Sequence, residues 1–105
     1  MVADVVGSKV NDWLVYIILC NDNTLYTGIT NNIERRMQQH ASQQGAKYFR
    51  GRRPQKLVHL EDGHDRSSAS QREAAIKKLR RAEKDILISS AVNRINALAV
   101  MIEFK

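Results

Sequence analysis

The residues that most restrict how this chain can fold are 14–19, Leu-Val-Tyr-Ile-Ile-Leu. A continuous apolar run rich in branched residues is typical of a β-strand that is covered on both faces. Residues 21–23 (Asn-Asp-Asn) follow as a strong turn signal, and residues 25–29 resume strand character. The sequence therefore predicts an antiparallel hairpin, and side-chain alternation places Tyr26 and Gly28 on one face of its second strand.

A helix is predicted next, over residues 32–41, with Asn31 or Thr30 as its N-terminal cap. Its expected buried stripe consists of apolar residues at four-residue spacing: Ile33, Met37 and Ala41. The helix thus follows the hairpin directly and should pack one face against it.

The two adjacent arginines of this helix are not equivalent. At about 100° per residue, Arg36 lies about 60° from Ile33 and His40 lies about 20° from it. By the same count, Arg35 lies about 160° away. We therefore expect Arg36 and His40 beside the buried stripe and Arg35 in solvent.

Residues 43–54 contain two glycines and the only proline, which predicts a long connection. Its basic side chains are Lys47, Arg50, Arg52 and Arg53. A third strand is expected over Lys56–Glu61, and Asp62 and Gly63 are expected to turn the chain out of it.

Two further helices are predicted. The first spans about residues 68–80, with Asp65, Ser67 or Ser68 as its cap. Its inward stripe is expected to be Ala69, Arg72, Ile76 and Leu79. Glu73, its only carboxylate, lies about 60° from that stripe. The final helix carries these apolar residues: Ala82, Ile86, Ile88, Val92, Ile95 and Leu98.

The predicted order is strand, strand, helix, strand, helix, helix (ββαβαα). An α+β fold, a three-stranded antiparallel sheet flanked by helices, is the simplest arrangement that buries these faces. We expect one domain over residues 12–98, preceded by a loose leader at 1–11 and followed by a tail at 99–105.

Charge and cysteine content restrict the function. The 105 residues carry a formal charge of +6, which favours a polyanionic partner, although a merely soluble basic protein would share it. With Cys20 as its only cysteine, the sequence predicts neither a disulfide framework nor a cysteine-based zinc site. No apolar run has the length of a membrane span, so a cytoplasmic location without membrane association is expected.

Five residues could carry chemistry together: Tyr16, Tyr26, Arg36, His40 and Glu73. Phosphodiester hydrolysis needs a base for water, positive charge on the phosphate and usually a metal. In this set a phenol could be the base, the arginine could hold the phosphate, and the carboxylate could bind the metal. Each also has a structural interpretation. The tyrosines could be core residues, His40 a helix-boundary residue, Arg36 a snorkelling side chain, and Glu73 an ion-pair partner of Lys77 four residues later.

At these residues the chain resembles the GIY-YIG endonuclease superfamily, and in particular its small stand-alone bacterial members. Residues 14–16 match the first signature element and residues 26–28 the second. Arg36 stands eight residues after Gly28, as the arginine of the family does, and His40 follows one turn later. The resemblance extends over about residues 13–88 and includes further stretches at 25–30, 34–36, 45–48 and 72–77.

The resemblance implies metal-dependent hydrolysis of DNA with one divalent ion, Mg²⁺ or Mn²⁺. Glu73 would hold the metal, and Arg36 would stabilise the phosphate. Tyr26 or Tyr16 would act as the general base or assist it. His40 would transfer a proton or contact the phosphate.

The chain departs from the family pattern at a few positions. Leu14 replaces the first glycine of the signature, Thr27 replaces an isoleucine, and Ile29 stands where some relatives place a lysine. The late asparagine of the family has two candidates here, Asn93 and Asn96.

The leading hypothesis is therefore an endonuclease, a hydrolase acting on DNA in repair or in processing of structured DNA. Its phosphate contacts are expected from Lys47, Arg50, Arg52, Arg53, Lys77 and Lys78. The alternative is a module with the same fold that binds DNA or RNA with little or no catalysis.

Overall fold

A computed structural model describes residues 12–42, 49 and 51–98 of the chain. Three strands form one sheet in the order β2-β1-β3, with both pairings antiparallel. The elements are β1 Trp13–Cys20, β2 Leu25–Thr30, α2 Ile33–Ala41, β3 Pro54–His64, α3 Arg66–Lys77, α4 Arg81–Ile88 and α5 Ile95–Leu98. The predicted α+β class and three-stranded antiparallel sheet are confirmed.

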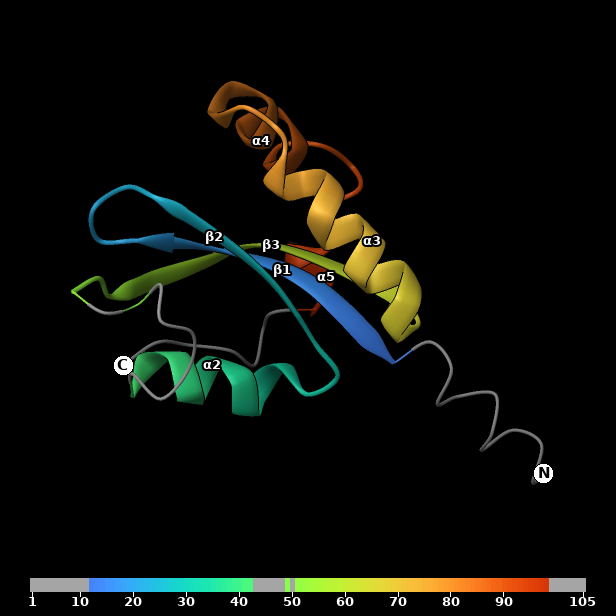
Figure 1. Ribbon diagram of the computed structural model, residues 1–105, viewed down its shortest axis with the longest axis horizontal. Helices are drawn as coiled ribbons and strands as arrows, with labels where there is room; N and C mark the ends of the chain where they lie inside the picture. The colour runs from blue at the N-terminus through green and yellow to red at the C-terminus, as the bar shows by residue number, and fades with distance from the viewer. Residues whose placement is uncertain (1–11, 43–48, 50, 99–105) are drawn as a thin grey trace.

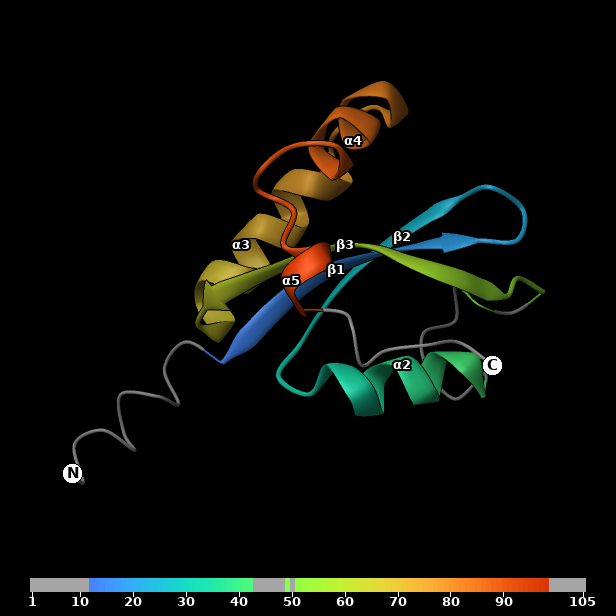
Figure 2. The same cartoon turned by 180° about the vertical axis from the view of Figure 1, so that it is seen from behind.

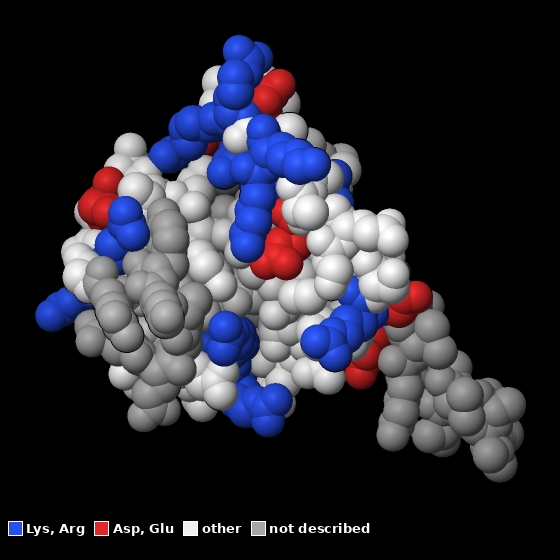
Figure 3. All heavy atoms as spheres, viewed as in Figure 1, with Lys and Arg blue, Asp and Glu red and all other residues white. Residues whose placement is uncertain are grey.

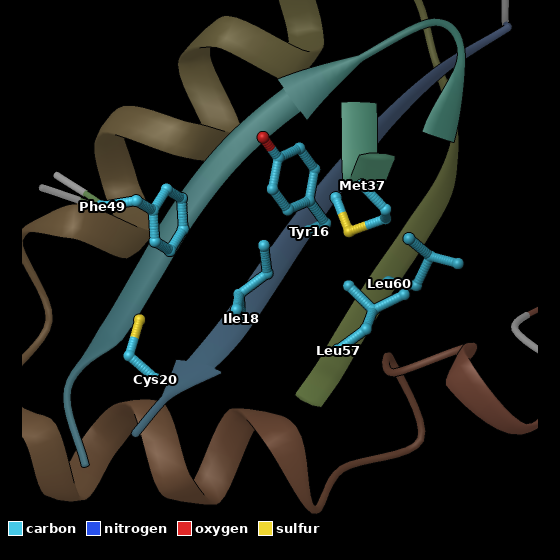
Figure 4. Packing of buried hydrophobic residues seen from close by; sticks show 7 residues of the cluster. All are labelled: Tyr16, Ile18, Cys20, Met37, Phe49, Leu57 and Leu60. Atoms are coloured by element: carbon cyan, nitrogen blue, oxygen red, sulfur yellow. The ribbon is translucent and has the colours of Figure 1, made fainter. Parts of the chain in front are cut away.

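The central strand β1 is buried on both faces, as its continuous apolar sequence predicts. Helix α2 covers one face of the sheet, and α3 lies across the other (Figure 1). The core on the α2 side consists of Tyr16, Ile18, Cys20, Met37, Phe49, Leu57 and Leu60 (Figure 4). The core on the α3 side consists of Val15, Ile17, Ala69 and Ile76. Alternate residues of β1 thus supply two separate cores.

The third strand is longer than predicted. It begins at Pro54, which suits the first position of a strand because no N–H is required there, and continues to His64. Asp62 and Gly63 do not turn the chain out of the sheet. Pairing shifts between Val15–Glu61 and Trp13–His64, and Gly63 (φ 79°) occupies the resulting β-bulge.

Helix α2 is capped by Asn32, not by Asn31 or Thr30. The Asn32 side chain accepts a hydrogen bond from the N–H of Arg35 at 3.1 Å, and the Thr30 hydroxyl accepts one from the N–H of Asn32 at 3.0 Å. Met37 is buried, as expected, but Ala41 is exposed. Ala41 is the last residue of the helix, and the buried residue of its last turn is His40.

The last part of the chain differs from the predicted pair of helices. Helix α3 starts at Arg66, earlier than expected, with Asp65 as its cap; it ends at Lys77, so Leu79 lies beyond it. The predicted final helix is two helices, α4 and α5. From behind, α5 is seen against β3 (Figure 2).

The break between α4 and α5 is held by Asn93. Its amide donates to the carbonyls of Val58 and Ile88, both at 2.8 Å. Its side-chain oxygen accepts from the N–H groups of Leu60 at 3.1 Å and Ile95 at 3.0 Å. One side chain thus satisfies backbone groups of β3, α4 and α5.

Within the described ranges, no helix has the length and apolarity needed to cross a membrane. The expected leader at 1–11 and tail at 99–105 lie outside these ranges, so their prediction stays untested.

Helix α3 is tied to β3 by a network centred on Glu61, which is 5% exposed. The carboxylate accepts hydrogen bonds from Arg72 at 3.0–3.1 Å and lies 2.9 Å from Nε2 of His59 and 3.2 Å from Nε2 of His64. Burial alone would raise the pKa of Glu61, but these hydrogen bonds outweigh burial and lower it to about 2.

This shift predicts acid sensitivity. A carboxylate with a lowered folded-state pKa stabilises the fold above its ordinary pKa, near 4.3, and loses that contribution as the pH falls through the folded-state value. Between about pH 5 and pH 2, the free energy of unfolding should therefore fall by about 3 kcal/mol from this group. Urea titrations at each pH measure it. Glu61→Gln should lose correspondingly less stability over this range; equal losses would contradict the assignment.

Candidate active site

The site is built around Tyr16, at the centre of β1. Its side chain is fully buried, and its hydroxyl reaches across to β2, where the paired residue is Gly28 (Figure 4). A Cβ atom at Gly28 would lie 2.5 Å from that hydroxyl oxygen and 2.6 Å from Cζ. The glycine is therefore required because the phenol occupies the space of a side chain.

The Tyr16 hydroxyl is hydrogen-bonded to Nε2 of His40 at 2.7 Å. His40 is fully buried; burial, followed by the charge of Arg36, lowers its pKa to about 4. The imidazole is therefore neutral at physiological pH. Burial also raises the pKa of Tyr16 well above its ordinary value, and Tyr26 adds to the effect. Tyr16 and His40 form a neutral, buried pair.

Tyr26, on β2, lies beside this pair and is only partly buried. Its ring centroid lies 6.2 Å from that of Tyr16 and 5.3 Å from that of His40, edge to face in the second case. The buried ring of Phe49 packs against both, 5.0 Å from Tyr26 and 4.6 Å from His40 between ring centroids. Of the two tyrosines, Tyr26 is partly exposed and Tyr16 is fully buried.

Arg36 is partly buried and Arg35 is exposed, as the helical phase predicts. Burial alone would lower the pKa of Arg36, but its interactions with the phenols of Tyr16 and Tyr26 raise it overall. Its Nη1 donates to Oε1 of Gln39 at 3.0 Å. A permanent positive charge is thus held beside both hydroxyl groups.

Glu73 approaches from the other face of the sheet, on α3. Its carboxylate is close enough to contribute to the raised pKa of Tyr16. The side chain is 23% exposed, and Oε2 lies 3.1 Å from Nζ of Lys77. The ion pair expected as an alternative role for Glu73 is therefore present, and it holds the carboxylate at the margin of the pocket.

This donor set fits a Mg²⁺ or Mn²⁺ ion held jointly with a substrate. Among the described residues, no three His, Cys, Asp or Glu side chains cluster as metal ligands. Mg²⁺ is commonly held by one or two carboxylates together with water and substrate phosphates. Glu73 is a carboxylate of this kind, and the ammonium group of Lys77 already occupies a cation position against it.

The expected phosphate contacts fall in two places. Arg52 and Arg53 lie beside the β1–β2 turn, where Nε of Arg52 pairs with Asp22 at 2.7 Å. Lys77 and Lys78 are exposed at the end of α3. Basic side chains gather where α3 leads into α4 (Figure 3). Lys47 and Arg50 lie outside the described residues.

The sequence did not identify every contributor. Gln39, which orients Arg36, carries a usable signal because i and i+3 residues are neighbours on a helix. Phe49 stands in a stretch of sequence without apolar periodicity, so no pattern marks its contact with His40. Asn93, a candidate for the late asparagine of the family, has its amide group fully engaged by backbone partners.

The hairpin, the inward-facing helix and the carboxylate on α3 define a GIY-YIG type of domain. A family model described as the GIY-YIG catalytic domain matches residues 12–85. The chain is 51% identical over 78 residues to a UPF0213 protein of Natronomonas pharaonis, covering 74% of this chain and 92% of that protein. A UPF0213 protein of Desulfotalea psychrophila is 49% identical over 87 residues, or 82% of this chain and 79% of the relative.

Two solved structures have a similar fold. The solution structure of a UPF0213 protein from Bacillus halodurans is 36% identical, covers 87% of this chain and 98% of its own, and has a TM-score of 0.51. A protein from E. faecalis is 38% identical over 75% of this chain and 83% of its own, with a TM-score of 0.53. The chain belongs to the GIY-YIG family, a family of nucleases, and its small UPF0213 members are its relatives.

The contact between Tyr16 and Gly28 makes a direct prediction. Gly28→Ala should lower the free energy of unfolding by about 1–3 kcal/mol, because the added methyl group meets the buried phenol. Urea denaturation measures this cost. In a Tyr16→Ala background the same substitution should cost less, because the conflict is gone. An equal cost in both backgrounds would contradict the steric explanation.

Proposed function

We propose that this protein is a metal-dependent endonuclease that hydrolyses DNA phosphodiester bonds. The observation that carries the proposal is the convergence of Tyr16, Tyr26, Arg36 and His40 on one side of β2, with Glu73 supplied by α3. Hydrophobic packing accounts for the rings but not for a partly buried guanidinium group between two phenols. A phosphate group is the anion that such an arrangement suits.

Arg36 would bind the scissile phosphate and stabilise the charge that grows on its oxygens. Because the guanidinium group is partly buried, its field is screened less than that of a surface arginine. Glu73 would hold the divalent ion on the side of the phosphate opposite to Arg36. The ion would supply positive charge for the leaving oxygen.

We infer that Tyr26, not Tyr16, contacts the attacking water. Tyr26 is partly exposed and lies beside Arg36, so a water molecule and a phosphate group could reach it together. The Tyr16 hydroxyl is buried and bonded to His40, and its raised pKa opposes ionisation. Tyr16 and His40 would then hold Tyr26 and Arg36 in place without exchanging a proton with the water.

The substrate would be DNA, with RNA as the other nucleic acid to be tested. Contacts from the basic residues at 47, 50, 52, 53, 77 and 78 would go to backbone phosphates, which bind without reading sequence. We therefore expect the enzyme to prefer a particular DNA structure to a particular base sequence. Such a preference suits DNA repair or the processing of branched intermediates, and we expect it to act in the cytoplasm. The second candidate is a binding module with little catalysis, favoured by the ion pair that Glu73 already makes with Lys77.

The first test compares wild type with Glu73→Gln on supercoiled plasmid, branched DNA and single-stranded DNA or RNA in Mg²⁺ or Mn²⁺. Loss of the carboxylate should reduce the nicking rate at least about 100-fold, because the metal loses its protein ligand. Salt-dependent binding should persist in the variant. If wild type nicks no substrate faster than Glu73→Gln but still binds nucleic acid, the endonuclease proposal is rejected and the protein is a binding module.

The second test uses the adjacent arginines as a matched pair. Arg36→Ala should lower the cleavage rate about 100- to 1000-fold, because phosphate stabilisation is lost. Arg35→Ala removes the same charge from an exposed position and should change the rate by no more than about twofold. Plasmid-nicking rates at saturating metal measure both. Equal losses would refute the role of Arg36.

A further inference from the structure

The strongest polar link outside the proposed active site joins α3 to β3. Arg72 donates from Nε to both carboxylate oxygens of Glu61, at 3.0 and 3.1 Å, and from Nη2 to Oε2 at 3.0 Å. Such bidentate, charge-assisted pairs fix direction as well as distance. Arg72 is also the immediate neighbour of Glu73 in the sequence.

Glu61 is itself held firmly. His59 and His64, both on β3, lie within hydrogen-bonding distance of its two oxygens, and His64 also contacts the hydroxyl of Ser68 on α3 at 3.0 Å. The carboxylate is therefore fixed relative to the sheet by residues of its own strand. Because Arg72 is bound to this carboxylate, its guanidinium group is also fixed relative to the sheet.

Arg72 and Glu73 lie on opposite sides of the buried stripe of α3. Relative to the stripe residue Ile76, Arg72 is displaced by about 40° in one direction and Glu73 by about 60° in the other. Arg72 reaches the edge strand β3, whereas Glu73 acts electrostatically on Tyr16, whose hydroxyl lies against the opposite edge strand, β2.

The buried stripe alone does not fix the roll of α3, meaning its rotation about its own axis. Its buried members are Ala69 and Ile76, and apolar contacts are non-directional. A roll of about 20°, at a side-chain radius of about 6 Å, would move the Glu73 carboxylate by about 2 Å. A functional metal ligand has to be placed within about 0.5 Å.

We propose that the Glu61–Arg72 pair is a positioning device that sets the roll of α3 and so places Glu73 at the active site. The inference rests on the proposed role of Glu73 as a metal ligand. Arg72 acts through the helix backbone, from the side of the buried stripe opposite to that of Glu73. It is thus a positioning residue.

The test measures Mn²⁺ binding to the full chain by electron paramagnetic resonance, together with the Mn²⁺ dependence of nicking. Arg72→Met and Glu61→Gln should each raise the Mn²⁺ dissociation constant about tenfold, as loss of a supporting residue does at other metal sites. Arg72→Lys, which keeps one donor, should give an intermediate value. The double variant Glu61→Gln with Arg72→Met should be no worse than Arg72→Met alone, because both remove the same link.

A matched control separates positioning from loss of stability. Ile88→Ala removes apolar contact from the same core without touching Glu61. It should lower the melting temperature but leave Mn²⁺ affinity unchanged. Equal weakening of Mn²⁺ binding in Ile88→Ala, or wild-type binding in folded Arg72→Met, would overturn the proposal.

Failure of the proposed function would look different. In that case wild type would bind Mn²⁺ no better than Glu73→Gln does. The rotation of α3 about its axis is then measured without metal, from the amide NMR shifts of β2, the edge strand that the helix contacts. Arg72→Met should move these shifts more than Ile88→Ala does. If it does not, the positioning role of Arg72 is refuted on its own.

Discussion

The structure depends on the burial of β1 on both faces. A strand in that position cannot present polar side chains to water on either side, so chemistry has to be carried beyond it. The phenol of Tyr16 extends over Gly28 of β2, which leaves the space empty, and its buried hydroxyl is hydrogen-bonded to His40. The edge strand β2 contacts α3 and, at Gly28, the phenol of Tyr16. The position of the Tyr16 hydroxyl is thus a consequence of how the core is packed.

The two faces of the sheet use ionisable groups in contrasting ways. On the α2 side, burial keeps Tyr16 and His40 neutral, and a single arginine supplies the charge. On the α3 side, the carboxylate of Glu61 stays ionised because hydrogen bonds from His59 and Arg72 outweigh the cost of burial. The first arrangement leaves a positive charge available to a ligand. The second is satisfied internally.

Local periodicity was sufficient to predict the hairpin, the fold class and the inequivalence of Arg35 and Arg36. It failed where the outcome depends on partners distant in sequence. Asp62-Gly63 has turn composition, but a glycine with positive φ serves a β-bulge equally well, and only the pairing with β1 decides between them. Likewise, the break between α4 and α5 depends on the bonds of Asn93 to β3.

The placement of Arg72 next to Glu73 also matters for protein engineering. An anchor and a functional carboxylate on consecutive residues keep a nearly constant angular relation whatever the length of the helix around them. A designer who transplants α3 to another sheet therefore needs to reproduce one external feature, a buried acid on the edge strand beneath the anchor. The Arg72–Glu73 dipeptide and the buried carboxylate that binds Arg72 together form a transferable unit for orienting a side chain relative to a sheet.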